Sequence, residues 1–390
     1  MTGRLGRVVV SSPAMQPPSG APSLVPLPPP VPSPPGDRRA PASTPPPPFG
    51  PPPLSTPTDQ SEPVQSDDDR SGPIASIVAV MARLIGWGTT AGVGAVMATQ
   101  GVGWDGNRLV ATLQALTPYG LPPVVAALVL AVWRRWLPLA VVSGLVAVGG
   151  FVLLIPLVVT ADQPAADPGA EEVRIASINL LFANPRIDEV GDLLDEIRPD
   201  VIVFSEYTAD HQFELLEHPI ADQFPHRVER DGLFSGGMAV WSRFPIDENA
   251  RPNTVNRTID STISAPDGPI RLFAVHPPTP VFDFEGWRAE LDAIGDAAER
   301  ADANTIVVGD FNASYWHPAF RDLTDRGLTD AHIANGSGFS TSWPTDSKIP
   351  PFVRLDHALT RSGLVPTDVS DFHVPGSDHT GFVVTVTPAR

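Results

Sequence analysis

The sequence predicts an α/β fold: a two-sheet α/β sandwich flanked by helices and preceded by transmembrane helices. Three long apolar stretches lie between residues 73 and 160. After them, over residues 172–390, runs of β-type residues alternate with segments of helical periodicity. Acidic, amide and imidazole side chains adjoin these runs, as in the sequence Ile306-Val307-Val308-Gly309-Asp310. Polar groups delivered from the ends of buried strands are how a sheet builds a rigid active site.

The first 72 residues have a composition of their own. Almost half of the 47 prolines in the chain lie before residue 73. The stretch has almost no apolar periodicity, so it cannot bury enough surface to offset its chain entropy. We therefore expect residues 1–72 to be a proline-rich disordered segment, locally in the polyproline II conformation. An extended tether is the favoured interpretation, and a ligand for a cytoplasmic partner is the alternative.

Three apolar stretches then predict a membrane region over residues 73–160. They cover about 74–99, 110–133 and 137–160, each near the ~20 residues that a helix needs to cross a bilayer. The third carries no charge, which disfavours the alternative of a buried helical bundle in a soluble protein. The second is the least regular, because it contains Pro118, Pro122 and Pro123.

Basic residues predict the orientation of these spans. Arg38, Arg39 and Arg70 precede the first stretch, and Arg134-Arg135 separate the second from the third. By the positive-inside rule, both positions are cytoplasmic. Three crossings then make this a multi-pass protein of the cell membrane. The linker at 161–171 and the domain at 172–390 are expected to be extracytoplasmic.

The charge balance limits the kinds of substrate that the domain is expected to bind. From residue 161 onward there are 17 basic and 37 acidic side chains, a net charge of −20, whereas the residues before it sum to +2. A strongly acidic surface repels polyanions, which weighs against long nucleic acid as the substrate. The chain has no cysteine, so disulfides and thiolate metal sites are excluded.

The domain itself predicts an alternation of strands and helices. A strand over 174–179 ends at Asn179, and a helix over 187–197 is stopped by Pro199. A buried strand at 201–204 then leads to Glu206, and the spacing of Trp287, Leu291 and Ile294 predicts a second helix. Further strands are expected at 237–242, 258–264, 270–275 and 304–309.

The order of polar residues along the domain is its most specific feature. It runs Asn179, Glu206, His276, Asp310-x-Asn312, Asp356 and Ser377-Asp378-His379. This order resembles the endonuclease/exonuclease/phosphatase superfamily over residues 172–390. Members of that superfamily include metal-dependent nucleases, sphingomyelinases and inositol-phosphate phosphatases. The proline-rich head and three spans resemble its membrane-anchored bacterial members.

The resemblance implies a divalent metal, Mg²⁺ or Mn²⁺, held by oxygen ligands. Glu206 is the expected principal ligand, with Asn179 beside it and Asp378 completing the shell. Such a metal would neutralise the charge on a phosphoester and activate water.

The resemblance also implies catalytic roles for five residues. Asp310 is expected to orient or deprotonate the attacking water, and Asn312 to hold the nucleophile and a phosphoryl oxygen. His379, charged through Asp356, is expected to donate to the phosphate, with His276 contacting it from the other side.

Each of these residues alone has a simpler interpretation. Asn179 could cap a turn, and Asp310 with Asn312 could form an Asx turn. Nothing in the sequence distinguishes the remaining domain histidines from surface residues; they include His317, His332, His357 and His373. Three arginines lie near the motifs and are candidates for phosphate binding: Arg186, Arg243 and Arg354.

These observations predict a membrane-anchored, divalent-metal-dependent phosphoester hydrolase, a phosphodiesterase or phosphatase acting outside the cytoplasmic membrane. Its expected substrates are a lipid headgroup or an inositol phosphate. A nuclease acting on nucleic acid is the alternative within the class. A catalytically inactive membrane anchor or scaffold is the alternative of another class, and the loss of a site residue would mark it.

Overall fold

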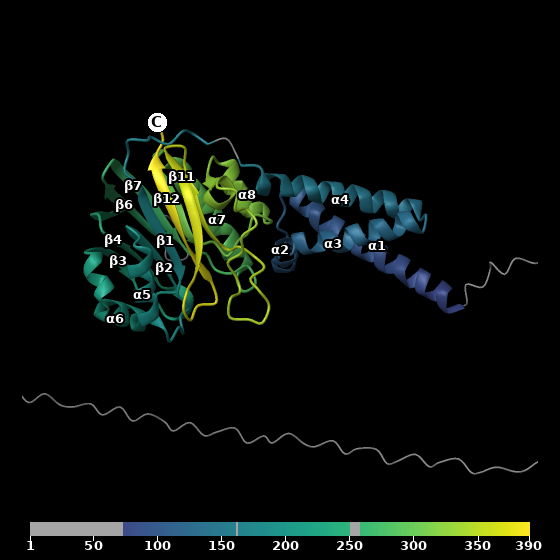
Figure 1. Ribbon diagram of the computed structural model, residues 1–390, viewed down its shortest axis with the longest axis horizontal. Coiled ribbons are helices and arrows are strands. Elements are labelled where there is room, and N and C mark those ends of the chain that lie inside the picture. The colour runs from purple at the N-terminus through teal and green to yellow at the C-terminus, as the bar shows by residue number, and fades with distance from the viewer. Residues whose placement is uncertain (1–72, 161–162, 250–257) are drawn as a thin grey trace, which may run out of the picture. The chain divides into compact units, whose positions relative to one another are not determined.

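The computed structural model describes residues 73–160, 163–249 and 258–390, so the segment predicted at 1–72 lies outside the described residues. Helices come first, and a domain of two β-sheets with flanking helices follows (Figure 1). The first helices are α1 (Pro73–Gly101), α2 (Arg108–Ala115), α3 (Thr117–Trp133) and α4 (Leu137–Val158).

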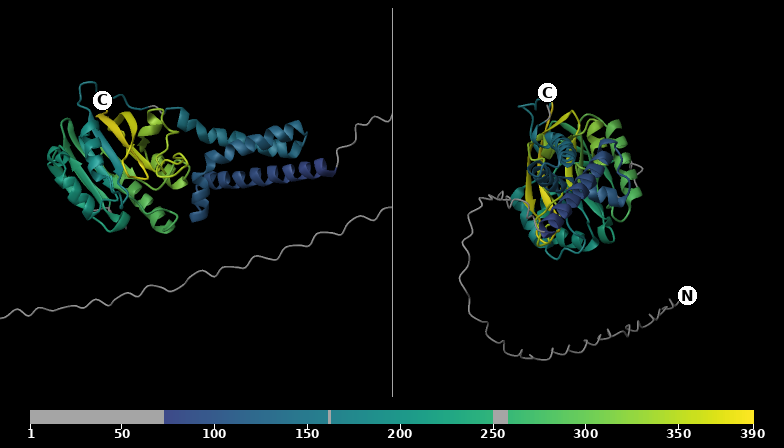
Figure 2. Two further views of the ribbon diagram at one scale, coloured as in Figure 1. Left: turned by 60° about the horizontal axis from the view of Figure 1, so that its bottom comes forward. Right: turned by 90° about the vertical axis from the view of Figure 1, so that its right-hand side faces the viewer.

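Two of these helices, α1 and α4, are long and apolar enough to cross a membrane. With 22 residues, α4 is about 33 Å long, close to the thickness of a bilayer core. Thr90 of α1 and Ser143 of α4 are hydrogen bonded at 2.9 Å between their hydroxyl oxygens. Figure 2 shows α1, α3 and α4 extending away from the sheets.

The predicted second span is divided in the structure. Helices α2 and α3 meet at an angle of 67°, on either side of Leu116. Pro118 lies in the first turn of α3, where its missing N–H costs nothing. The same proline could not extend α2, because it cannot donate the next helical hydrogen bond. Helix α3 has 17 residues, and together with α2 it is apolar enough to form one broken span.

Among the described residues, each sheet has six strands. The first has the order β11-β12-β1-β2-β4-β3 and the second β5-β6-β7-β8-β10-β9. The strands of the first are β1 (Val173–Asn179), β2 (Val201–Ser205), β3 (His226–Arg230), β4 (Met238–Ser242), β11 (Leu364–His373) and β12 (Thr380–Pro388). Those of the second are β5 (Ile246–Glu248), β6 (Ile259–Ala265), β7 (Gly268–Val275), β8 (Thr305–Asp310), β9 (Thr329–Asp330) and β10 (Asp356–Thr360).

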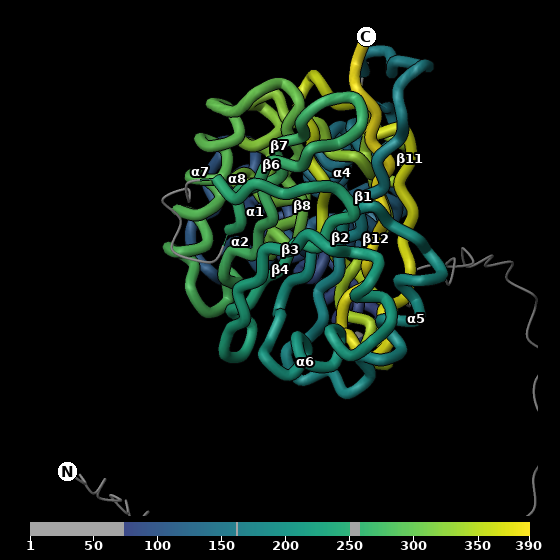
Figure 3. Tube along the Cα trace, turned by 90° about the vertical axis from the view of Figure 1, so that its left-hand side faces the viewer, coloured from purple at the N-terminus to yellow at the C-terminus, as the bar shows by residue number. Residues whose placement is uncertain are grey.

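Strand periodicity explains why the sheets are covered on both faces. In β2, Val201 and Val203 enter the apolar core between the sheets, whereas Ile202 and Phe204 face the opposite way. The outer face of the first sheet is covered by α5 (Ile187–Ile197) and α6 (Ala209–Glu217). The outer face of the second packs against α7 (Phe284–Arg300) and α8 (Pro318–Asp325). Figure 3 shows α7 and α5 on opposite sides of the strands, which confirms the predicted sandwich.

The pairing of strands brings the polar motifs to one edge of the sandwich. Strands β1 and β2 are parallel, as are β7 and β8, so the ends of each pair lie together. Strand β10 is antiparallel to β8, which places Asp356 opposite Asp310. Strand β12 is antiparallel to β1 and begins just after His379. Asp356 and His379 therefore stand where strands begin, whereas Asn179 and Asp310 stand where strands end.

Candidate active site

Unusual backbone conformations mark the edge where the motifs meet. Glu206 directly follows β2 with a φ of 58°, and Asn312 follows β8 with a φ of 47°. Leu181, two residues after Asn179, has a φ of 60°. Residues other than glycine rarely adopt this left-handed backbone conformation, and strain of this kind clusters at functional sites. The three conformations therefore mark this edge of the sandwich as a candidate functional site.

Gly309 lets β8 approach its neighbour closely. Its φ is 146°, and a Cβ at this position would lie 2.1 Å from the carbonyl oxygen of Val275. No other residue fits there without moving β7 or β8. The glycine thereby holds Asp310 beside the end of β7, which is followed by His276.

Asp310 is the centre of the site. Its carboxylate is buried, and its Oδ2 atom accepts a hydrogen bond from Asn179 Nδ2 at 3.0 Å. The same oxygen lies 3.6 Å from His276 Nε2 and 3.8 Å from His379 Nε2. Its Oδ1 atom accepts from the backbone N–H of Asn312 at 2.8 Å. One carboxylate thus lies close to residues from β1, from the turn before β12 and from the loop after β7.

A buried ion pair adjoins this carboxylate. His379 donates through Nδ1 to Asp356 Oδ2 at 2.8 Å, and both side chains are almost fully buried. Burial alone would lower the pKa of His379, but the charges of Asp356 and Asp310 outweigh it and raise the pKa to about 10. Burial acts to raise the pKa of Asp356, and the attraction of His379 outweighs it, so that pKa is lowered. The pair is an imidazolium with a carboxylate at neutral pH.

The pKa of Asp310 is shifted in the opposite direction from that of Asp356. Burial, and then repulsion from Asp356, raise the pKa of Asp310, against the attraction of His379 and His276. Two carboxylates at one site are expected to separate in pKa in this way. Asp310 is therefore the more basic of the two carboxylates at this edge.

Glu206 joins the same group of contacts through Asn179. Asn179 Nδ2 donates to Glu206 Oε1 at 3.3 Å, and the Oε2 atom of Glu206 accepts from the Phe182 N–H at 2.9 Å. Asn179 Oδ1 accepts from Leu181 N at 3.0 Å, so the amide presents its nitrogen to the two carboxylates. Glu206, Asn179 and Asp310 consequently form one continuous polar group.

Asp378 and Asn312 have contacts of a different kind. The Oδ2 atom of Asp378 accepts from Trp343 Nε1 at 3.1 Å, while its buried Oδ1 atom has no hydrogen-bond partner among the described residues. The side chain of Asn312 donates to the carbonyl oxygen of Pro277 at 3.0 Å, which ties the turn after β8 to the loop after His276.

Two sets of donors could hold a metal ion. Asp310, Asp356 and His379 offer ligand atoms within 4.8 Å of one another. Because His379 has a pKa of about 10, a proton occupies its Nδ1 atom at neutral pH, which opposes metal binding there. Glu206, Asn179 and Asp378 offer carboxylate and amide oxygens, the donors that Mg²⁺ prefers. The orphaned buried Oδ1 atom of Asp378 fits this second set.

Several supporting residues were not identified from the sequence. Ser377 donates to the Asn179 carbonyl at 2.7 Å and accepts from His379 N at 3.0 Å. Ser342 accepts from the N–H of Asp356 at 3.3 Å. Ser377 lies inside a recognised motif, but a serine in a loop such as Ser342 has no distinguishing pattern.

The arginines singled out in the sequence have other partners. Arg186 pairs with Glu189, and Arg243 donates to Gln223 at 3.0 Å. Arg354 is buried and pairs with Asp371 at 2.6 Å. Arg186 and Arg243 are thus held by groups outside the site, whereas Arg354 also donates to the Asp356 carbonyl oxygen at 3.2 Å, and its charge helps to lower the pKa of Asp356.

The expectation of surface histidines is also wrong for three residues. His317, His332 and His357 are buried, whereas His373 is exposed. His357 bonds to Asp330 at 2.7 Å, and His332 bonds to Asp371 at 3.1 Å.

Comparison with known proteins agrees with this architecture. The sequence model of the Endonuclease/Exonuclease/phosphatase family matches residues 176–379, more than half of the chain. The chain belongs to this family. The matched region begins in β1 and ends at His379, so it contains every motif described above. Family members are generally hydrolases that act on phosphoesters.

Solved structures with a similar fold include humanized TDP2 of D. rerio, at 15% identity and a TM-score of 0.47, over 55% of this chain and 99% of that one. The AP endonuclease of Archaeoglobus fulgidus is similar at 16% identity and a TM-score of 0.44, over 54% of this chain and 98% of that one. A family protein of Bacteroides thetaiotaomicron has 15% identity and a TM-score of 0.44, over 57% and 99% of the two chains. No curated protein matches the sequence.

Proposed function

We propose that the protein is a membrane-anchored, divalent-metal-dependent phosphoester hydrolase whose active site is the edge around Asp310. The observation that carries this proposal is the position of the Asp310 carboxylate. It contacts Asn179 and lies within 3.8 Å of both His276 and His379. A buried carboxylate between two imidazoles and an amide is a costly arrangement for a merely structural site.

Glu206, Asn179 and Asp378 would hold Mg²⁺ or Mn²⁺. When bound, the ion would neutralise charge on the phosphoester and polarise its oxygens. For Asn179 to supply an oxygen, its amide must turn, because its nitrogen now faces Glu206 and Asp310. Glu206 keeps its carboxylate half-buried and oriented by the Phe182 N–H, so it is the best-prepared ligand.

Asp310 is the general base in this proposal. Its raised pKa makes it a better proton acceptor than an ordinary aspartate, and the Asn312 N–H fixes the orientation of its carboxylate. Asn312 itself, held by Pro277, would orient the nucleophile and a phosphoryl oxygen.

His379 is the proposed electrostatic contact to the phosphate. Its Nδ1–H is used by Asp356, so its Nε2–H is the donor available for a phosphoryl oxygen. His276 would contact the phosphate from the other side of Asp310. With a pKa of about 10, His379 remains cationic throughout the neutral range, and its contribution is lost only as the pH rises through that value.

We further propose that the domain lies outside the cytoplasmic membrane. The arginine bias makes the Arg134-Arg135 turn cytoplasmic, and α4 then leads outward. Contacts between the domain and the loop that joins α1 to α3 support this topology. Gln100, near the end of α1 where that loop begins, donates to the Trp316 carbonyl at 2.9 Å, so this end of α1 and the domain belong on the same side. Residues 1–72 would then face the cytoplasm and any partner there.

The favoured substrate is a small or lipid-borne phosphoester, a lipid headgroup or an inositol phosphate. Proximity to the membrane and a net charge of −20 after residue 161 both favour it over a polyanion.

Nucleic acid is the second candidate, and one observation favours it. The Phe182 and Phe234 rings pack edge to face at 5.9 Å beside Glu206, and both are substantially exposed. Exposed aromatic rings can stack on bases. An inactive scaffold is disfavoured, because each of the eight predicted site residues is present.

A substrate panel tests the proposal. The full chain in detergent is assayed on phosphatidylinositol, sphingomyelin, inositol phosphates, DNA, RNA and bis(p-nitrophenyl) phosphate, each with Mg²⁺ and with excess chelator. We expect metal-dependent hydrolysis of at least one small or lipid phosphoester. Activity that survives the chelator would contradict the metal assignment, and preference for DNA or RNA would establish the second candidate.

A further inference from the structure

The loop between α1 and α3 is bound to the catalytic domain by buried polar groups. We call residues 100–116 the juxtamembrane segment. Four of its residues are buried: Gln100 at the end of α1, Asp105, and Ala111 and Gln114 of α2. A buried acid and a buried amide need hydrogen-bond partners, and here the domain supplies most of them. The segment is also tied to itself, since Gln114 donates to the Trp104 carbonyl at 3.1 Å.

The domain partners of Gln100 and Asp105 lie on α7 and on and around α8. Gln100 donates to the Trp316 carbonyl at 2.9 Å, and its own carbonyl accepts from Arg321 at 2.9 Å. Asp105 accepts from the Ala319 N–H at 3.2 Å and forms a close ion pair with Arg288 of α7. The segment therefore joins α7 to the first turn of α8.

His317 makes a third connection, to Ala111. Its Nδ1 atom accepts from Ser314 N at 2.8 Å, so the neutral ring carries its proton on Nε2 and donates to the Ala111 carbonyl at 3.0 Å. Burial lowers the pKa of His317 to about 4, which keeps the ring neutral at neutral pH.

These connections reach the residues proposed for catalysis. Phe311 stands between Asp310 and Asn312, and its ring packs against Phe320 of α8 at 5.8 Å. Its carbonyl accepts from Trp287 Nε1 at 3.3 Å, and the Trp287 ring meets His317 edge to face at 5.2 Å. Ala111 belongs to the same apolar cluster as Phe311, Phe320 and Trp287. The juxtamembrane segment thus supports, from outside, the layer that carries residues 310–312.

We propose that Asp105 and Gln100 are positioning residues for the reaction, which hold the start of α8 against α7 and thereby fix the turn at residues 310–312. The inference rests on the proposed function of that turn. Both residues lie outside the matched family region, residues 176–379, so this support is supplied by the membrane part of the chain. The catalytic unit is complete only when the juxtamembrane segment is included.

The test uses the full chain with Asp105→Asn, which removes the charge that pairs with Arg288 but keeps the side-chain volume. A misplacement of about 1 Å at catalytic groups can cost on the order of 100-fold in rate. We therefore expect kcat on a soluble phosphodiester to fall at least about tenfold per folded molecule, with KM changed less than about twofold. Asp105→Glu, which retains the carboxylate, is expected to recover part of the loss.

Two further variants provide the controls. Gln100→Leu removes the bond to Trp316 without changing charge and is expected to act in the same direction. Arg108→Gln alters a charge in the same segment at an exposed position, and it is expected to leave kcat unchanged. A general destabilisation would lower the folded fraction of a variant, but kcat per folded molecule would then stay near the wild-type value.

Hydrogen exchange provides a readout that does not depend on activity. In Asp105→Asn, the amides of residues 311–314 are expected to exchange faster than in the wild type, while those of β2 stay unchanged. Unchanged exchange there, together with a kcat within twofold of wild type, would overturn the inference. A wild-type protein without phosphoesterase activity would refute the proposed function alone, because the exchange experiment would still decide the role of the segment.

Discussion

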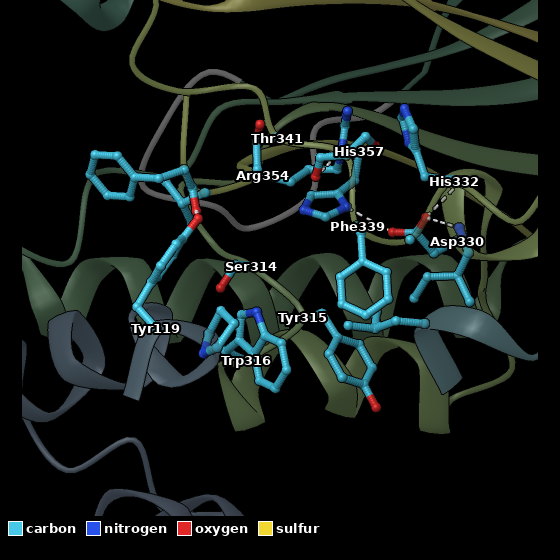
Figure 4. A pocket seen from close by; sticks show the side chains of 17 residues that line it. Tyr119, Ser314, Tyr315, Trp316, Asp330, His332, Phe339, Thr341, Arg354 and His357 are labelled. Atoms are coloured by element: carbon cyan, nitrogen blue, oxygen red, sulfur yellow. Dashed lines mark hydrogen bonds and ion pairs between the residues drawn. The ribbon is translucent and has the colours of Figure 1, made fainter. Parts of the chain in front are cut away.

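Two buried histidine–aspartate pairs use neighbouring residues of one strand. Asp356 pairs with His379 at 2.8 Å, and the next residue, His357, pairs with Asp330 at 2.7 Å. Successive residues of β10 face opposite sides of the sheet, so the pairs lie on different faces. Figure 4 shows the second pair, whose two members line a cavity of about 130 Å³. All four side chains are almost fully buried.

The two pairs differ in the group that lies next to the second ring nitrogen of the histidine. His357 Nε2 donates to the Ala313 carbonyl at 3.1 Å, which completes its hydrogen bonds. His379 Nε2 lies 3.8 Å from a second carboxylate, Asp310, too far for a hydrogen bond. In the His357–Asp330 pair both ring nitrogens are therefore hydrogen bonded, and this closed pair joins two parts of the fold. The His379–Asp356 pair instead keeps a charged N–H donor beside the basic carboxylate of Asp310. In our proposal, the same two residue types serve stability in one case and chemistry in the other.

The largest difference between the pairs is expected in turnover. His379→Ala removes the proposed phosphate contact and should lower kcat about 10² to 10⁴-fold. Asp356→Asn should act through His379, so the double variant should be little slower than His379→Ala alone. Steady-state kinetics on the four proteins of this cycle measure the coupling. Losses that simply multiply would show that Asp356 and His379 act separately.

The closed pair is expected to affect folding instead. His357→Ala leaves the Asp330 carboxylate buried without its partner, which should cost about 3–5 kcal/mol in the free energy of unfolding. His373→Ala, at an exposed histidine of the same domain, should change it by less than about 0.5 kcal/mol. Denaturant titration of the full chain measures both. Loss of turnover in His357→Ala without loss of stability would put the closed pair in the active site.

The active-site edge and the closed pair are also expected to differ in their effect on metal affinity. Glu206→Gln keeps the shape of the side chain but removes the charge that faces Asn179, so the Mg²⁺ concentration for half-maximal activity should rise at least about tenfold. Metal titration of activity measures this shift. Asp330→Asn should not shift it, and an equal shift in both variants would remove the distinction between the regions.

The smallest expected differences are in pH dependence. Burial raises the pKa of Asp330, but the pairing with His357 outweighs it and lowers the value to about 2, from an ordinary 3.8. Its stabilisation should be complete above about pH 4 and lost as the pH falls through about 2. His379 has a raised pKa of about 10, so its contribution should be complete below about pH 6.5 and lost as the pH rises through 10. Acid unfolding of Asp330→Asn, compared with wild type, tests the first pH range. The fall of the wild-type rate at alkaline pH tests the second.

Much of the fold could be predicted because local patterns agreed with the tertiary structure. Asn179, Glu206 and His276 each follow a run of buried β-type residues, and the helix expected over 187–197 is α5. Strand ends can be located from periodicity, and parallel pairing then brings the ends together. The break at Leu116 also has a local cause, Pro118, although the sequence suggested a continuous span.

The remaining parts depend on contacts that no local pattern contains. His332 and His357 lack apolar periodicity around them, yet Asp371 and Asp330 satisfy them in the interior. Asp105 is an isolated acid in a loop and is buried only because Arg288, far along the chain, packs there. Such residues become recognisable when the sheets and helices are assembled, since burial decides their role.

The most direct test of the account compares Asp310→Asn with Asp330→Asn. Both variants neutralise a buried aspartate that lies beside a histidine, in the same domain and with little change in volume. The measurement is kcat per folded molecule on a phosphodiester with saturating Mg²⁺. The account predicts that Asp310→Asn loses about 10² to 10⁴-fold and remains folded, while Asp330→Asn stays within about threefold of wild type. Similar rates for the two variants would contradict the assignment of catalysis to the edge around Asp310.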